Sequence, residues 1–504
     1  MHFTVLDYSI VIVYLISVLL FGLYTSGKQT STKDYFLGSK SIPWWAACFS
    51  VVATETSTLT FISIPGLAYI SNMNFLQLAF GFVIGRIIVA FIFLPKYYSG
   101  NMETAYQFLG SRFGKPMRKY ASVTFIVLRI FADGVRLFTT AIPIKFITGL
   151  GYFECILIVG IVTVIYSYIG GIKAVIWTDV IQMFIYFIGA AASMYVIYTL
   201  LPGGWSDVVN YATPGDKFQS FNFTMPSSLT ELFTGGYSLT GGLIGGAFLA
   251  MASHGTDQLI VQRLLTCKDK KSSQKAVIFS GVIVFIQFAV FLLIGLMLFA
   301  LYKGAEYKTL MLDANNLTKP DEIFPMFIVS YLPAGLSGLV VAGLLSASMS
   351  TLSSTFNSLA STTILDLFQG NRFLKNEMDE MKYSRLATLF WAIVIMGTGL
   401  LFQSETNPAV DFALRIQSLI YGGLLGVFLL GMVFRKARLV DAVISYSFAI
   451  LILTALFILP KFGIIPSLNL TWFTFFGVII TFVTANVTML FRSKTTDNMP
   501  QTPE

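Results

Sequence analysis

Polar residues gather inside three otherwise apolar stretches of this chain, and their types suit the binding of a small cation or a polar solute. The first stretch runs from Ala53 to Thr60, holds Glu55 among Thr and Ser residues, and is followed by Pro65 and Gly66. Such a stretch favours an interrupted helix whose freed carbonyls face a cavity. The hydroxyls could instead bond back to the preceding helical turn, but this alternative does not account for Glu55.

The second stretch, Ala347 to Thr355, consists mainly of Ser and Thr, and residues three or four positions apart share one face of a helix. The positions on that face are Ala347, Ser350, Thr351 and Ser354. A small hard cation prefers several oxygen ligands, so this column of hydroxyls predicts a cation site. Close helix packing, for which membrane proteins also use small residues, is the alternative.

The third group consists of charged residues. Asp179 stands at the start of an apolar run, where its carboxylate could complete a second cation site or cap a helix. Arg129, Asp133 and Arg136 are spaced by four and three residues, so they can share a helical face and pair with one another. The surplus positive charge of this trio is expected to bind an anionic solute or to neutralise Glu55.

The composition places these groups in a membrane. The 504 residues are 55% hydrophobic and 12% charged, with a net charge of +8, whereas soluble chains carry about twice that fraction of charge. The basic residues lie in short loops, so no basic face for nucleic acid is expected. The 3 Cys and 2 His lack paired or metal-ligand spacing, which argues against a disulfide scaffold and a histidine-rich metal site.

Apolar runs long enough to cross a bilayer core, about 20 residues, occur thirteen times. They are expected at 7–25, 43–70, 76–95, 118–149, 152–170, 177–200, 234–260, 274–302, 324–365, 384–403, 411–433, 438–460 and 470–491. The first run has no basic leader and no cleavage site, so we expect a retained span rather than a signal peptide.

Loop charges predict the orientation, because Lys and Arg accumulate in cytoplasmic loops. Basic loops alternate here with loops that are nearly uncharged or balanced by acidic residues. The basic loops are Lys96–Lys119, Arg263–Lys275, Arg372–Arg385 and Arg435–Arg438. With an odd number of spans, this pattern predicts a multi-pass protein of the cell membrane, with the N-terminus outside and the C-terminus in the cytoplasm.

Other functions find less support in the residues. Gly22 to Lys28 has the spacing of a phosphate-binding loop, but Gln29 replaces the Ser or Thr that would hold magnesium, and the stretch leaves an apolar run rather than a strand. ATP-driven transport is therefore not expected. No repeated pore loop or charge ring favours a channel. No nucleophile, base and orienting residue share one neighbourhood, so an enzyme is not expected.

Over nearly its whole length the chain resembles the sodium/solute symporters, a family that includes sodium/glucose, sodium/proline and bacterial sialic acid symporters. The residues that carry the resemblance are Ala53–Pro65, Gly170–Gln182 and Ala347–Ser358. The resemblance implies an all-α, LeuT-like fold with an inverted repeat of five plus five helices. The repeats would be 43–200 and 234–433, with a leading helix at 7–25, two trailing helices at 438–491 and a cytoplasmic tail at 492–504.

The resemblance also implies sodium ligands. Sodium site one would consist of the carbonyls of Ala53, Thr56 and Ala347 with the hydroxyls of Ser350 and Thr351. Sodium site two would consist of Asp179, Ser350, Ser353 and Ser354. Two Na⁺ ions per cycle, no organic cofactor and a monomer that works in the lipid bilayer are therefore expected.

The substrate pocket departs from the pattern of the sialic acid symporters. Ser57, Thr60 and Phe75 match it, but Glu55 replaces a threonine. Ala79 replaces a glutamine, and Ala132 stands where an arginine would bind the substrate carboxylate. Arg129 or Arg136, each within about a turn of Ala132, could take over that contact.

The expected function is therefore sodium-coupled symport of a small polar organic solute by alternating access. Sialic acid is the first candidate for the solute. A neutral sugar, an amino acid or another carboxylate are the alternatives. A cation channel or a sensor with a transporter fold is the rival class.

Overall fold

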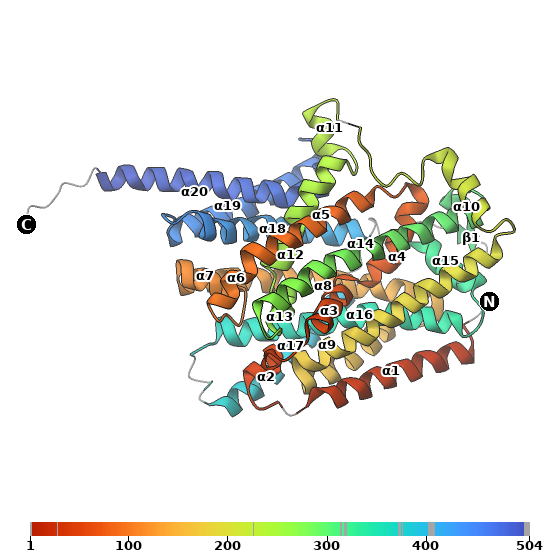
Figure 1. The fold of residues 1–504 in the computed structure, drawn as a ribbon, viewed down its shortest axis with the longest axis horizontal. Helices are drawn as coiled ribbons and strands as arrows, with labels where there is room; N and C mark the ends of the chain where they lie inside the picture. The colour runs from red at the N-terminus through yellow and green to blue at the C-terminus, as the bar shows by residue number, and fades with distance from the viewer. Residues whose placement is uncertain are drawn as a thin grey trace, which may run out of the picture.

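The computed structural model of this chain describes residues 3–27, 29–224, 226–312, 315–316, 320–370, 374, 376–401 and 409–497. The long helices lie side by side with roughly parallel axes, and the two termini lie at opposite ends of the bundle (Figure 1). The all-α prediction is confirmed, since the strands β1 (Met311–Leu312) and β2 (Asn315–Asn316) form only a minimal hairpin. Residues 498–504 of the predicted tail lie outside the described residues.

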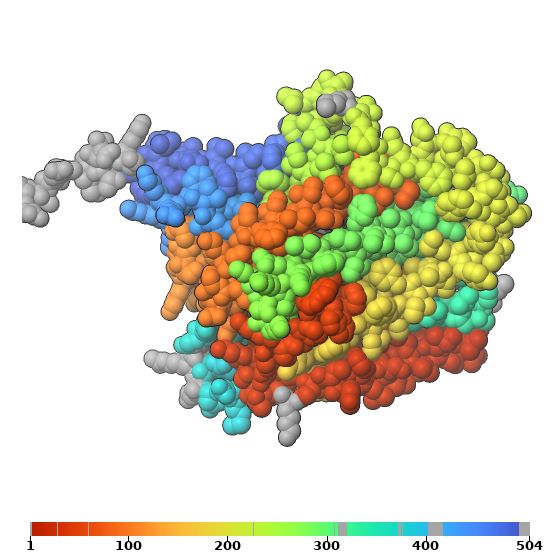
Figure 2. Space-filling model, viewed as in Figure 1, coloured from red at the N-terminus to blue at the C-terminus, as the bar shows by residue number. Residues whose placement is uncertain are grey.

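The long helices have the following bounds. They are α1 (Val5–Ser26), α5 (Phe75–Ile88), α8 (Lys115–Thr148), α9 (Tyr152–Leu200), α14 (Lys270–Leu301), α16 (Leu336–Ser361), α17 (Glu377–Leu401), α18 (Ala409–Val433), α19 (Leu439–Ile458) and α20 (Phe473–Asp497). Short helices connect or extend them: α2 (Thr32–Leu37), α6 (Leu94–Ser99), α7 (Tyr106–Phe113), α10 (Trp205–Ala212), α11 (Leu229–Thr234) and α15 (Ile323–Tyr331). The segment around α11 projects from the edge of the bundle (Figure 2).

The first of two interrupted helices consists of α3 (Trp44–Glu55) and α4 (Thr58–Ile70), which are bent by 60° relative to each other. The break falls at Thr56 and Ser57, whose backbones are extended. The sequence predicts an interrupted span here, but Pro65 lies inside α4 rather than at the break. The helix therefore opens at the hydroxyl-rich segment beside Glu55.

The second interrupted helix consists of α12 (Gly246–Gly255) and α13 (Gln258–Leu265), separated by Thr256 and Asp257. Asp257 caps α13 by accepting a hydrogen bond from the backbone N–H of Leu259 at 2.8 Å, a role that short polar side chains commonly fill. α12 packs closely on α5, because a Cβ atom on Gly85 would lie 2.3 Å from the carbonyl oxygen of Ala247. The two interrupted helices lie near the starts of the ranges 43–200 and 234–433, whose relation as repeats stays a prediction.

The prediction of separate spans at 152–170 and 177–200 fits α9. This helix has 49 residues, about 74 Å at 1.5 Å per residue, which is more than twice the thickness of a bilayer core. Gly171 interrupts it with φ 53° and ψ −149°. A Cβ atom there would lie 2.4 Å from the carbonyl oxygen of Tyr35, so glycine is required at this break.

The predicted single span at 324–365 is wrong in its bounds. The structure separates α15 from α16 at the segment 332–335, which holds Pro333 and Gly335. Gly335 has φ 89°, a left-handed conformation that ends helical geometry. The hydroxyl-bearing helix therefore begins at Leu336.

Apolar side chains cover the outside of the bundle. On α1, Ile12, Val13, Ile16 and Leu20 are each more than half exposed, a contiguous surface suited to lipid rather than water. Among the described residues, eight helices are long and apolar enough to cross a membrane, or nine if α3 and α4 count as one span. The count of thirteen spans stays a prediction.

Candidate functional site

Helix α16 places its hydroxyl column against the first interrupted helix. Thr351 Oγ1 donates to the carbonyl oxygens of Thr54 and Ala347, each at 3.2 Å. Thr54 Oγ1 lies 3.0 Å from Ser354 Oγ. The column therefore faces the break between α3 and α4 and does not face lipid.

The predicted ligands of sodium site one are all buried in this contact: Ala53, Thr56, Ala347, Ser350 and Thr351. The hydroxyl of Ser350 has no hydrogen-bond partner by distance and angle, although buried polar groups in proteins nearly always have one. Thr56 Oγ1 is held by Gln287, whose Nε2 lies 2.7 Å away. An unpaired hydroxyl beside freed carbonyls matches the oxygen ligands that a small cation needs.

The predicted ligands of sodium site two surround a residue that sequence reasoning missed. Asp179 in α9 is fully buried, and its Oδ2 accepts a hydrogen bond from Arg263 Nη2 at 3.1 Å. The same Nη2 also donates to Ser354 Oγ, and Arg263 Nε donates to Ser50 Oγ at 2.8 Å. Ser353 Oγ instead donates to the carbonyl oxygen of Ser350, at 3.0 Å.

The assignment of Arg263 to a basic cytoplasmic loop is therefore wrong. Its side chain is fully buried in α13, because the second interrupted helix continues to Leu265 rather than ending near residue 260. The signal available in the sequence was the pair Leu264 and Leu265, which follows Arg263 directly and lies beyond the predicted span end. An isolated charge flanked by apolar residues in this way indicates a buried partner.

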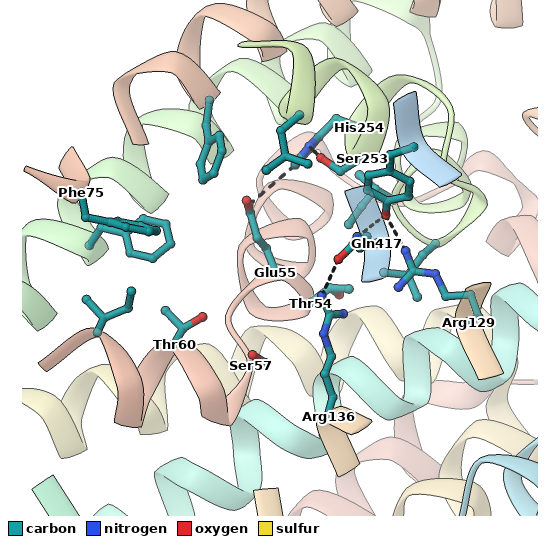
Figure 3. A pocket seen from close by; sticks show the side chains of 17 residues that line it. Thr54, Glu55, Ser57, Thr60, Phe75, Arg129, Arg136, Ser253, His254 and Gln417 are labelled. Atoms are coloured by element: carbon teal, nitrogen blue, oxygen red, sulfur yellow. Dashed lines mark hydrogen bonds and ion pairs between the residues drawn. The ribbon is translucent and has the colours of Figure 1, made fainter. Parts of the chain in front are cut away.

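One cavity, of ≈ 870 Å³ with its open mouth included, collects all six predicted substrate residues. They are Glu55, Ser57, Thr60, Phe75, Arg129 and Arg136 (Figure 3). Other polar side chains in its wall, Thr54, Ser253, His254, Gln417 and Tyr421, were not predicted. The cavity lies at the break in the first interrupted helix.

Glu55 lines this cavity between Phe75 on one side and Gln417 on the other (Figure 3). Its side chain is 23% exposed, and Oε2 forms an ion pair with Arg86 of α5, which is fully buried. His254 Nε2 lies 3.7 Å from the same oxygen, beyond hydrogen-bond distance. The sequence assigned no role to Arg86; in the structure it neutralises Glu55.

The predicted pairing of Arg129, Asp133 and Arg136 is confirmed. Arg129 Nη1 lies 3.5 Å from Asp133 Oδ2, and Arg136 Nη1 lies 3.2 Å from Asp133 Oδ1. The predicted surplus of positive charge is wrong, because Arg129 also forms an ion pair with Asp257 at the second helix break. Arg129 is only 1% exposed, whereas Arg136 is 18% exposed and donates to Gln417 Oε1 at 3.0 Å.

A polytopic bundle with two interrupted helices around a polar cavity defines a transporter of small molecules. The chain belongs to the sodium:solute symporter family, whose model matches residues 35–447. Its members in these comparisons are sodium-coupled transporters rather than enzymes. Sodium coupling, a solute as partner and a multi-pass membrane location follow for this chain.

Similar proteins include two sodium/sialic acid symporters. NanT of Aliivibrio fischeri is 28% identical over 88% of this chain and 86% of its own. SiaT of Proteus mirabilis is 28% identical over 95% of this chain and 92% of its own. A sodium-dependent multivitamin transporter of Oryctolagus cuniculus is 29% identical over 88% of this chain and 69% of its own.

Solved structures agree with this fold. A substrate-bound, outward-open Na⁺-coupled sialic acid symporter superposes with a TM-score of 0.84 at 26% identity, over 97% of this chain and 98% of that chain. Mhp1, a nucleobase-cation-symport-1 family transporter, superposes with a TM-score of 0.54 at 13% identity, over 93% of this chain and 96% of that chain. The second likeness shows the fold alone.

Proposed function

We propose that this protein takes up a small polar organic solute together with Na⁺ by alternating access. The carrying observation is the contact of Thr351 Oγ1 with the carbonyl oxygen of Thr54 at 3.2 Å, beside the buried, unpaired hydroxyl of Ser350. It brings hydroxyls of α16 to carbonyls freed by the break between α3 and α4. Na⁺ at site one would hold α3 and α16 together.

Sodium binding would prepare the cavity for the solute. Glu55, Ser57 and Thr60 lie on either side of the break that site one would order, so the ion and the solute share one structural element. A first ligand that orders a shared element raises the affinity for the second. One charge moving through 100 mV contributes roughly 2.3 kcal/mol to the work of uptake.

A second Na⁺ at Asp179, Ser350, Ser353 and Ser354 is the finer form of this proposal. Arg263 Nη2 donates to Asp179 Oδ2 at 3.1 Å, but the buried Oδ1 of Asp179 has no hydrogen-bond partner by distance and angle and would be the oxygen that meets the ion. The ratio of ²²Na⁺ to labelled solute taken up by proteoliposomes counts the ions. A ratio of two would support the second site, and a ratio of one would leave site one alone.

For the solute, sialic acid is the candidate that the names of two relatives suggest. A neutral sugar, an amino acid or another carboxylate are the alternatives. Arg136 is the guanidinium for a carboxylate to approach, because it is more exposed than Arg129. The protein would work as a monomer in the cell membrane, with the N-terminus outside.

Transport in proteoliposomes tests the proposal. Purified protein should accumulate labelled solute when Na⁺ outside exceeds Na⁺ inside, and K⁺ should not replace Na⁺. Unlabelled solute trapped inside should accelerate entry of the label, because a carrier exchanges its cargo. Conductance without this counterflow would instead identify a channel, and solute binding without flux would identify a sensor.

A further inference from the structure

We infer that the solute cavity selects an uncharged, hydroxyl-rich solute such as a sugar or polyol, and that the Glu55 carboxylate is the hydrogen-bond acceptor that enforces this choice. The inference rests on the proposed function, because it assumes that the cavity holds the transported solute. The charges in the cavity wall are the observations that narrow the class of solute.

The negative charge of Glu55 is already compensated inside the protein. Arg86 is fully buried and forms an ion pair with Glu55 Oε2, while Arg86 Nη1 donates to Ser280 Oγ at 3.1 Å. A cationic solute would therefore meet Arg86 behind Glu55 and gain little net attraction. The carboxylate nevertheless remains 23% exposed and can accept hydrogen bonds from the cavity side.

The positive charges of the cavity are compensated in the same way. Each arginine that lines its described part lies within 3.5 Å of a carboxylate: Arg129 with Asp257 and Asp133, and Arg136 with Asp133. An anionic solute would thus have to draw Arg136 away from Asp133 and from Gln417. Displacing paired groups in a buried site costs most of what the new contact contributes.

The position expected to supply a carboxylate-binding guanidinium holds Ala132, which is fully buried. Ala79, which replaces a pocket glutamine, is also fully buried. Neither small side chain can reach a solute in the cavity. Among the described residues that line the cavity, none is therefore an arginine left free to bind an anion, and Glu55 is a hydrogen-bond acceptor in this wall.

His254 offers a second reason to expect a hydroxyl group. Its Nδ1 lies 2.8 Å from Ser253 Oγ, and its buried Nε2 has no hydrogen-bond partner while lying 3.7 Å from Glu55 Oε2. A hydroxyl both donates and accepts, so it can donate to Glu55 while it accepts from His254 in the tautomer whose Nε2 carries the proton. A carboxylate can only accept, and beside Glu55 it would add like-charge repulsion.

Apolar side chains form the opposite wall. Phe75 and Phe288 lie with ring centroids 5.0 Å apart, and Phe82 and Phe288 lie 6.3 Å apart. Ile64 and Leu249 extend this surface. A wall of this kind suits the C–H face of a sugar ring, while the hydroxyl edge faces Glu55, His254 and Thr60.

Matched pairs of sugars test the inference. We expect glucose and galactose to raise the thermal stability of the detergent-purified protein in Na⁺. The concentrations needed should be about tenfold lower than those of glucuronate and galacturonate. One unfavourable charge contact of about 1.4 kcal/mol corresponds to this factor. Sialic acid and its methyl ester form a third pair. Equal or tighter binding of the acid in any pair, or no binding of every neutral member, would overturn the inference.

Variants of Glu55 separate charge selection from a general loss of binding. Glu55→Gln leaves Arg86 unpaired, so the preference should shift towards the acid of each pair. Glu55→Gln combined with Arg86→Gln removes both charges, including the carboxylate that repels an acid, so the two members of each pair should bind with similar affinity. Glu154 is an exposed residue outside the cavity. The control variant Glu154→Gln should change neither the affinity for the neutral sugars nor the preference over the acids. An unchanged preference in a folded Glu55→Gln protein would also overturn the inference.

The outcome for the proposed function is distinct. If uptake is sodium-dependent but the acids are transported with higher affinity than the neutral sugars, only the inference on solute charge is contradicted. Absence of sodium-dependent uptake for every probe, acids included, contradicts the symport proposal itself.

Discussion

Arg263 Nη2 in α13 donates a hydrogen bond to Asp179 Oδ2 in α9 at 3.1 Å, and both side chains are fully buried. This pair joins the segment after the second helix break to the helix that carries the carboxylate of predicted sodium site two. The guanidinium contacts Oδ2, whereas the buried Oδ1 of Asp179 has no hydrogen-bond partner by distance and angle. The pair is therefore a structural link that still leaves one carboxylate oxygen for a second ion.

Removing either partner should destabilise the protein strongly. Asp179→Asn and Arg263→Gln each leave an uncompensated buried charge, at an expected cost of about 3–5 kcal/mol. The double variant removes both charges, so its cost should fall well below the sum of the two. Thermal unfolding in detergent measures all three.

The control for this cycle is an exposed ion pair. Lys33 Nζ lies 3.4 Å from Glu103 Oε1, and the Lys33 side chain is 72% exposed, so Lys33→Gln should change stability by less than about 1 kcal/mol. If the losses at Asp179 and Arg263 simply add in the double variant, the buried pair is not the link described.

Ser350→Ala should separate sodium binding from stability. The buried hydroxyl has no hydrogen-bond partner by distance and angle and lies beside the Asp179 carboxylate, so its removal should lower the melting temperature in K⁺ only slightly. The rise in melting temperature on adding Na⁺ should shrink, because a ligand stabilises the folded protein less when its dissociation constant increases. Ser346→Ala is the control, since it loses a hydrogen bond to Tyr14 at 2.7 Å and should cost about 1 kcal/mol in either salt.

Thr351→Ala should raise the Na⁺ concentration needed for half-maximal uptake by tenfold or more, about 1.4 kcal/mol, because it removes a proposed ligand of sodium site one. Thr351→Ser keeps the oxygen and should retain most of the activation. Thr199→Ala removes an exposed hydroxyl at the end of α9 and should leave the sodium dependence unaltered. Wild-type sodium activation in Thr351→Ala proteoliposomes would remove Thr351 from the site.

Substitution of the two cavity arginines, Arg129 and Arg136, should have different effects on stability and on solute binding. Arg129→Gln leaves fully buried Asp257 without its ion pair, so loss of stability by about 3–5 kcal/mol should dominate. Arg136→Gln affects a partly exposed side chain and should change the solute KM severalfold with a smaller change in melting temperature. Equal losses of stability in the two variants would contradict this division.

Several features of this protein follow from local residue patterns. Apolar run length predicts helices along the membrane, and the hydroxyl spacing from Ala347 to Ser354 predicts a polar face on one of them. The short spacing of Arg129, Asp133 and Arg136 predicts their pairing, because residues three and four apart meet on a helix without help from the rest of the fold. These inferences need only helical geometry and the cost of polar groups in lipid.

What the tertiary structure alone decides is which distant charges meet. Arg86 reaches Glu55 across 31 positions and Arg263 reaches Asp179 across 84, separations at which sequence spacing carries no information about distance. Helix packing brings them together, and in a medium of low dielectric each buried charge requires a partner at short range. Those pairings decide whether the cavity carries a net charge and which oxygen of Asp179 is left for a second ion.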